Sequence, residues 1–237
     1  MGHGECILGP ELCNFLNYWR SLGGGDQVPA RRLLDLRRLT SILRWMFILE
    51  MDGDGSLRFR LAGSSLEEAV GFGMTDQTYD SIFDSTLDGG MAEELYGLSI
   101  VRGCGVLRSG VVTTDGDYFH ELEVLALPFA DERAMGGTVL VGAIRPIEIE
   151  NQSFEDRRDT LVMSIDDMFL LPSPNLITPQ QMSNRLTQLL KENGIDLRVV
   201  DMEQIFNQVE EGIVPNGQSL PSFNLEVAAA GVQEVVN

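Results

Sequence analysis

The order of strand and helix signals constrains the fold of this chain more than any other feature. Strand patterns occur near residues 45–51, 56–62, 106–114, 118–128 and 137–145. The sequence Asp52-Gly53-Asp54-Gly55 joins the first two strands and favours a tight hairpin. Between residues 64 and 104 the pattern is helical and is interrupted by glycines. Two strands, a helical middle and three strands predict an α+β fold, a five-stranded antiparallel sheet with helices on one face.

Helices are also predicted before the sheet. Residues 10–22 form an amphipathic pattern, because four apolar side chains recur at i, i+3, i+4 and i+7. These four residues are Leu12, Phe15, Leu16 and Trp19. The glycines at 23–25 end this helix. A second helical stretch is predicted from Leu33 to about Arg44.

The chain beyond the predicted sheet is acidic, with 13 acidic and 5 basic side chains in residues 151–237. Capped amphipathic patterns predict two short helices there, at about 179–193 and 202–211, followed by a loose tail. The predicted organisation has three parts. Residues 1–30 are a flanking N-terminal helix and loop, residues 31–148 are the core domain, and residues 149–237 are an acidic C-terminal extension.

Charge and composition exclude several classes of partner. The net charge of −19 repels nucleic-acid phosphates and anionic lipids, so we expect neither nucleic-acid binding nor membrane insertion. An arginine cluster at 31–44 is interpreted as a solvated face that pairs with neighbouring acids. Residues 1–20 lack the pattern of a secretion signal. The three cysteines form no C-x-x-C pair and fit reduced thiols, so we expect a cytoplasmic protein.

A family resemblance rests on six segments in one order along the chain. They are Tyr18-Trp19 with Pro29-Ala30-Arg31, Phe47-Ile48-Leu49, Phe59–Ser64, Gly71–Thr75, Leu125–Phe129 and Gly137–Gly142. Together they resemble a PAS-domain family common in alphaproteobacteria, over about residues 12–146. The resemblance implies a PAS fold and a small stand-alone regulatory or sensory protein without an attached enzyme domain. Leu36 departs from the family pattern, which has a proline after the Pro-x-Arg segment.

A cavity is expected between the sheet and its helices, with apolar walls and one polar group, as is typical of a small-molecule pocket. Its predicted lining residues are Phe59, Leu61, Phe72, Tyr79, Phe83, His120, Leu122 and Val124. His120 has the strand parity of Leu122 and Val124, so it or Tyr79 would supply the polar group. His120 either contacts a ligand or a haem iron, or is a hydrogen-bonded core histidine, the reading we favour. No motif in the sequence indicates a particular cofactor, so the identity of any cofactor stays open.

Patterns that carry catalysis are missing from the sequence. It contains no dinucleotide or P-loop glycine motif and no nucleophile elbow. Its histidines and cysteines match no standard metal-ligand spacing. We therefore expect no catalytic residue and no metal site.

The leading hypothesis is a non-enzymatic regulatory or sensory PAS protein that acts in signal transduction. It would bind a small ligand, a protein partner, or both. The stripe of Leu12, Phe15, Leu16 and Trp19 is predicted to join a homodimer interface. In the alternative, this helix folds back over its own sheet. Two other functions stay open: a structural dimerisation or adaptor module without a ligand, and an enzyme with an unrecognised site in the cavity.

Overall fold

One β-sheet organises the structure, a computed structural model that describes residues 8–24, 27–83, 87–113, 119–147, 161–171, 198–200 and 222–224. Its strands lie in the order β2-β1-β5-β4-β3-β6-β7-β8. They are β1 (Met46–Met51), β2 (Leu57–Ala62), β3 (Gly105–Thr113), β4 (Phe119–Ala130), β5 (Thr138–Pro146), β6 (Val162–Leu171), β7 (Arg198–Val200) and β8 (Ser222–Asn224). Neighbours from β2 through β6 are antiparallel, so the expected α+β sheet is confirmed.

The β1–β2 hairpin forms where the sequence predicts it. The Asp52 N–H donates to the Ser56 carbonyl at 2.9 Å, and the Gly55 N–H donates to the Asp52 carbonyl at 3.0 Å. Gly55 has φ +89°, a left-handed conformation that glycine adopts without steric cost. The Asp54 carboxylate accepts from the Ser56 N–H at 3.0 Å. These bonds close the turn and fix the antiparallel pairing.

A β-bulge in this hairpin changes which way one side chain faces. Ile48 pairs with Leu61, but Leu49 pairs with Phe59, so Arg60 is an extra residue in β2. Phe59 therefore lies on the helix-covered face with Leu49, whereas Leu61 lies on the opposite face with Ile48.

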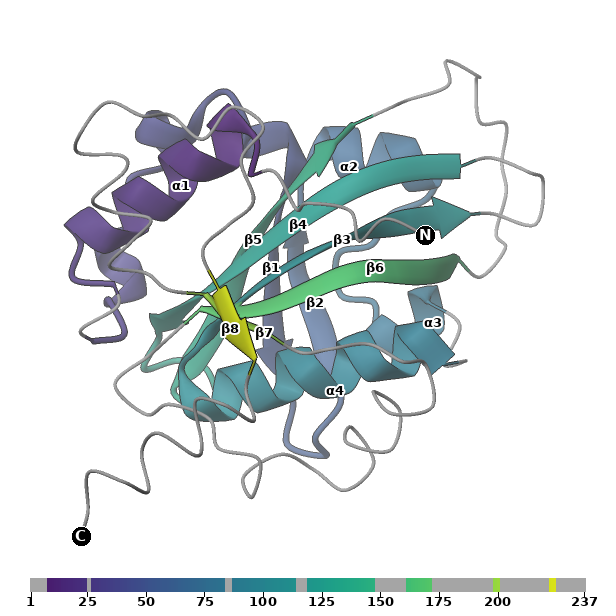
Figure 1. Ribbon diagram of the computed structural model, residues 1–237. Coiled ribbons are helices and arrows are strands. Elements are labelled where there is room, and N and C mark those ends of the chain that lie inside the picture. Colours follow the sequence, from purple (N-terminus) through teal and green to yellow (C-terminus); the bar gives the residue numbers. More distant parts are fainter. Residues whose placement is uncertain are drawn as a thin grey trace, which may run out of the picture.

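The inner face of the sheet is covered by α2 (Ser64–Val70), α3 (Tyr79–Ile82) and α4 (Leu87–Arg102) (Figure 1). Glycine at 71, with φ +80°, ends α2. On the sheet side the inner core includes Phe47, Leu49 and Val124, and on the helix side it includes Leu95 and Tyr96. The predicted helices between 64 and 104 thus lie on one face of the sheet.

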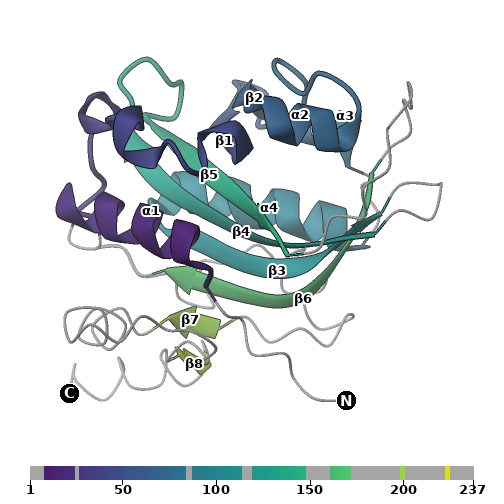
Figure 2. The same ribbon diagram turned by 90° about the horizontal axis from the view of Figure 1, so that it is seen from above.

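The outer face is covered by α1 (Pro10–Ser21), which lies on the side of the sheet opposite α4 (Figure 2). The indole Nε1 of Trp19 donates to the Pro128 carbonyl of β4 at 3.0 Å. At the start of α1, Glu123 of β4 accepts a hydrogen bond from the Gly9 N–H at 3.1 Å. The same carboxylate oxygen accepts from Arg145 Nε at 2.9 Å. Helix α1 is therefore bound to the sheet at both its ends.

The predicted helix over 33–44 is wrong. The chain forms three 3-10 turns, η1 (Arg31–Leu33), η2 (Leu36–Leu39) and η3 (Leu43–Trp45). The hydroxyl of Tyr18 separates the first two: it donates to the Leu33 carbonyl at 3.1 Å and accepts from the Asp35 N–H at 2.7 Å. These bonds replace the backbone pairs that a continuous helix would need at this point.

Strand β6 extends the sheet beyond the five strands predicted. It pairs with β3 along the full length of β3, from Gly105–Leu171 to Thr113–Val162. The short strands β7 and β8 follow it, β7 parallel to β6. The helices predicted at 179–193 and 202–211 lie outside the described residues. No helix in the described part of the chain is long and apolar enough to span a membrane.

Candidate functional site

The predicted cavity residues form most of an aromatic cluster in the inner core. Tyr79 stacks on Phe59 with ring centroids 6.0 Å apart, and its ring lies 4.7 Å from that of Phe83. Tyr96 of α4 approaches the edge of Tyr79 at 5.8 Å. Phe72 is partly buried against this core. These rings pack against one another, so the part of the inner core they occupy is filled by protein.

Leu61 does not belong to this site, which corrects the sequence prediction. The bulge at Arg60 turns it to the outer face, where it is 39% exposed. His120 lies in β4 opposite Val112, but its side chain is outside the described part of the structure. Its predicted role stays untested. Leu122 and Val124 are buried in the inner core, in the same cluster as the aromatic residues.

A cavity of about 50 Å³ lies beside the aromatic cluster, between α2 and strands β3, β4 and β5. Apolar side chains form nearly all of its wall. They include Trp45, Leu66, Val112, Leu122 and Ile144, together with Phe83. Two of the predicted cavity residues, Phe83 and Leu122, therefore line the actual cavity.

Arg108 is the charged residue among the described residues of the cavity wall, and it was not predicted from the sequence. It lies in β3 between Val124 of β4 and Met168 of β6, and only 4% of its surface is exposed. Its Nε donates to the Tyr96 hydroxyl at 2.9 Å. Val106 and Val112, on the same strand parity, belong to the inner core. That parity was a usable signal, because an arginine on the buried face of a strand is uncommon.

Tyr79 and Cys104 stay protonated in this environment. Burial raises the pKa of the Tyr79 hydroxyl far above its ordinary value, although the nearby Arg108 charge opposes the shift. Burial also raises the pKa of Cys104 to about 11. The Cys104 thiol donates to Ser99 Oγ at 3.7 Å. A neutral thiol is a poor nucleophile, so Cys104 is a packing residue at the start of β3.

The interface residues predicted on α1 lie elsewhere than expected. Leu12, Phe15, Leu16 and Trp19 are buried in the outer core of their own chain, against β4 and β5. They leave no surface for a second copy, so the fold-back alternative describes α1. The physical reason is that the outer sheet face, with Leu125, Leu127 and Phe129, is itself apolar and must be covered.

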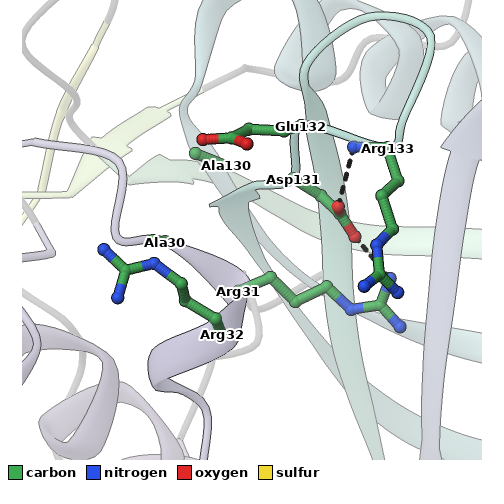
Figure 3. A pocket seen from close by; sticks show the side chains of 7 residues that line it. All are labelled: Ala30, Arg31, Arg32, Ala130, Asp131, Glu132 and Arg133. Atoms are coloured by element: carbon green, nitrogen blue, oxygen red, sulfur yellow. Dashed lines mark hydrogen bonds and ion pairs between the residues drawn. The ribbon is translucent and has the colours of Figure 1, made fainter.

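A second hollow lies on the surface, between η1 and the start of the β4–β5 loop. This cleft of about 530 Å³ is lined by Ala30, Arg31, Arg32, Ala130, Asp131, Glu132 and Arg133. Arg31 pairs with Asp131 at 2.6 Å. Figure 3 shows the guanidinium groups of Arg31 and Arg133 beside the Asp131 carboxylate, with Arg32 pointing away. The Arg133 N–H and the Arg31 side chain hold the pKa of Asp131 below its usual value.

Sheet order and helix placement define the class of this protein. Strands in the order 2-1-5-4-3, with the helices that connect β2 to β3 packed on one face, are the arrangement of PAS sensory modules. The family model of the PAS domain matches residues 9–144, so the chain belongs to the PAS domain family. The matched region begins at α1 and ends in β5. No curated protein and no solved structure was found to match the chain.

Membership of this family gives the chain a general role in sensing and signalling. PAS domains are typically sensory modules without enzymatic activity, and they often mediate protein interactions. Among the residues that the structure describes, no group of three His, Cys, Asp or Glu side chains is placed to hold a metal ion.

Proposed function

We propose that this protein is a non-enzymatic regulator that senses a small organic anion in the inner cavity. The observation that carries the proposal is the guanidinium of Arg108 in the wall of an otherwise apolar hollow. A permanent positive charge at such a place favours a ligand with an apolar body and a carboxylate head. Because Arg108 holds Tyr96 of α4, a ligand that binds Arg108 would change a contact between sheet and helix. Through that contact, ligand binding in the cavity would change how α4 packs on the sheet.

The cavity volume limits the ligand to a few non-hydrogen atoms. Pockets for drug-sized ligands enclose about 300–1,000 Å³, whereas this cavity encloses about 50 Å³. Acetate matches both the volume and the charge, and propionate and butyrate match the charge but need α2 to move slightly from the sheet. Larger ligands would have to displace α2 from the sheet.

Chemistry at the cavity wall favours binding over catalysis. The described lining residues include one guanidinium and otherwise only apolar side chains. Arginine stays protonated near neutral pH and exchanges no proton with a substrate. This supports a sensor in preference to the enzyme alternative. A purely structural module would use Arg108 only for contacts such as its hydrogen bond to Tyr96.

A titration of the labelled protein with butyrate, followed by two-dimensional amide NMR, tests the proposal. We expect saturable shifts at residues around the cavity, such as Leu66, Val112 and Ile144. Butyramide, which has the same shape without the charge, should bind at least tenfold more weakly, because charge-assisted hydrogen bonds are about twice as strong. Shifts that spread over the surface without saturation would contradict the proposal.

Two variants and one control make this test specific. Arg108→Met removes the charge, and Ala69→Leu fills the cavity from α2, so each should abolish the saturable shifts. Ala69→Leu keeps the proposal testable if Arg108→Met does not fold. Arg133→Met, which removes an exposed charge from the surface cleft, should bind butyrate like the parent protein. Equal butyrate binding by all three variants would rule the cavity out.

Homodimer formation and a cytoplasmic location belong to the same proposal. The location is supported by the buried free thiols Cys13 and Cys104, which suit a reducing compartment. A dimer would have to use a surface other than the buried stripe of α1. Light scattering on the purified chain measures the subunit number directly.

A further inference from the structure

An apolar groove of about 180 Å³ lies on the outer face of β1 and β2, beside the 3-10 turns. Three of the leucines that line it are exposed: Leu36 by 42%, Leu43 by 37% and Leu61 by 39%. The other lining residues are Arg31, Leu34, Met46, Phe47, Ile48 and Val141. Single exposed leucines are ordinary, but several around one groove mark an interaction surface. We call this set of residues the leucine groove.

Two local features of the chain create the leucine groove. The bulge at Arg60 turns Leu61 outward, where regular alternation would bury it beside Phe59. The break between η1 and η2 leaves Leu36 at the surface, where Leu39, later in the same turn, is buried. Both features add exposed apolar area next to β1, a central strand already covered on its inner face. Folding alone does not require either exposure.

The surface around the groove is basic, in contrast to the rest of the chain. Residues 31–45 contain five arginines and one aspartate, a local net charge of +4, so the remainder carries −23 to give the total of −19. Arg31 lines both the leucine groove and the polar cleft of Figure 3. The groove and the cleft therefore adjoin at Arg31, so an apolar surface lies next to a polar one.

The charges of this surface are only partly neutralised from within. Arg37 pairs with Asp35 and Arg44 with Glu68, both at the surface, where such pairs contribute little and exchange easily. Among the described residues, Arg32 has no ion-pair partner, and Arg133 lies beside the Asp131 carboxylate that already pairs with Arg31; both arginines are exposed. The sequence interpretation of a solvated face thus holds for some of the arginines. The cleft is lined by three arginines and by Asp131 and Glu132, so its lining keeps a net charge of +1.

We propose that the leucine groove and the adjoining cleft bind an acidic amphipathic segment of a partner protein. Apolar side chains of the segment would fill the groove, and its carboxylates would meet Arg32 and Arg133. A second copy bound through the same surface would bring arginine clusters face to face, which opposes a symmetric dimer here. A nucleic acid would bring a long row of phosphates against a chain whose remainder carries −23, and it has no apolar side chains to fill the groove. A short acidic protein segment has few negative charges and can place leucines in the groove, so it is the matching occupant.

Fluorescence anisotropy with designed peptides tests this surface independently of the cavity. The probe is a labelled helical peptide with leucines at i, i+3 and i+7 and glutamates on the flanks. Its control has lysines in place of the glutamates. We expect the full-length protein to bind the acidic probe at least tenfold more tightly than the basic one, with an association rate that falls as salt rises.

Variants locate the binding surface. The double variant Leu36→Ser, Leu61→Ser removes apolar contacts, and Arg32→Glu with Arg133→Glu reverses the charge of the cleft. Each should weaken binding of the acidic probe at least tenfold. Val101→Ser, at a site on α4 that is 64% exposed, is the matched control and should change nothing.

Three results would overturn the proposal. The first is equal binding of the acidic and basic probes. The second is unchanged affinity in both double variants. The third is a dimer in solution that Leu36→Ser with Leu61→Ser converts to a monomer, because the groove would then be a self-interface. None of these results affects butyrate binding in the inner cavity.

Discussion

Glu123 provides a sharp test of whether α1 is an integral part of this PAS domain. Only 2% of its side chain is exposed, and it is held by Arg145 Nε at 2.9 Å and the Gly9 N–H at 3.1 Å. Removing one partner of a buried ion pair costs about 3–5 kcal/mol. Arg145 is 26% exposed and can regain water, which places the cost near 3 kcal/mol at the lower end of that range.

The bond to Gly9 adds to this cost. Losing the acceptor of a backbone N–H at the start of a helix removes about 1 kcal/mol. We therefore expect Glu123→Ala to lower the free energy of unfolding by about 3–4 kcal/mol. Glu123→Gln keeps the shape and an acceptor but loses the charge, and should cost roughly half as much.

Urea unfolding followed by far-UV circular dichroism measures these values, provided that the denaturant slope stays constant between variants. Glu121→Ala, at an exposed position of the same strand, is the control and should change stability by less than about 0.5 kcal/mol. If Glu123→Ala stays within about 1 kcal/mol of the parent protein, the buried contact between α1 and the sheet does not stabilise the fold as argued.

Three further changes test the packing. Gly142→Ala should cost about 1–3 kcal/mol in urea unfolding, because an added Cβ would lie 2.0 Å from Phe47 Cζ; no loss would mean that the ring moves freely. The free energy of unfolding should fall as pH rises from about 9 to 11. Burial raises the pKa of Cys13 and of Cys104 to about 11, so the thiols of the unfolded chain ionise first. The Cys13→Ala, Cys104→Ala variant should show a smaller fall, and an equal fall would mean that these two thiols do not cause it. Trp19→Phe should lose at least about 1 kcal/mol in thermal unfolding, because it removes the hydrogen bond to Pro128 and leaves part of the volume of a buried indole unfilled. No change would contradict both contributions.

The sheet was predictable because its strands alternate apolar and polar residues and because turn-forming residues separate them. The Asp-Gly-Asp-Gly turn permits only a tight reversal, and the β1–β2 pairing follows from it. The bulge at Arg60 was not predictable, because Leu57, Phe59 and Leu61 alternate regularly with arginines in the sequence. Since one extra residue reverses the parity of all that follow it, Leu61 was assigned to the wrong face.

Strand β6 and Arg108 were missed for different reasons. The adjacent Asp166 and Asp167 interrupt the alternation of β6, and its partner β3 shows a register shift at the same place. The sequence of β6 therefore shows little of the alternation typical of a strand, and the strand forms because it pairs with β3. Arg108 lies in a strand that was predicted, and its parity with Val106 and Val112 would have placed it inside. The helix predicted over 33–44 is broken by hydrogen bonds to the Tyr18 hydroxyl, which is distant in the sequence. Helix propensity depends on local sequence and does not include such a contact.

If the inner cavity senses a small anion, native mass spectrometry of the chain isolated gently from its own cells should detect that anion bound to it. We expect a population heavier than the bare chain by one small carboxylic acid, and the loss of that population in Ala69→Leu. Added butyrate should restore an adduct in the parent protein stripped of its ligand. A folded parent protein that carries only the mass of the bare chain, with or without butyrate, would contradict the claim.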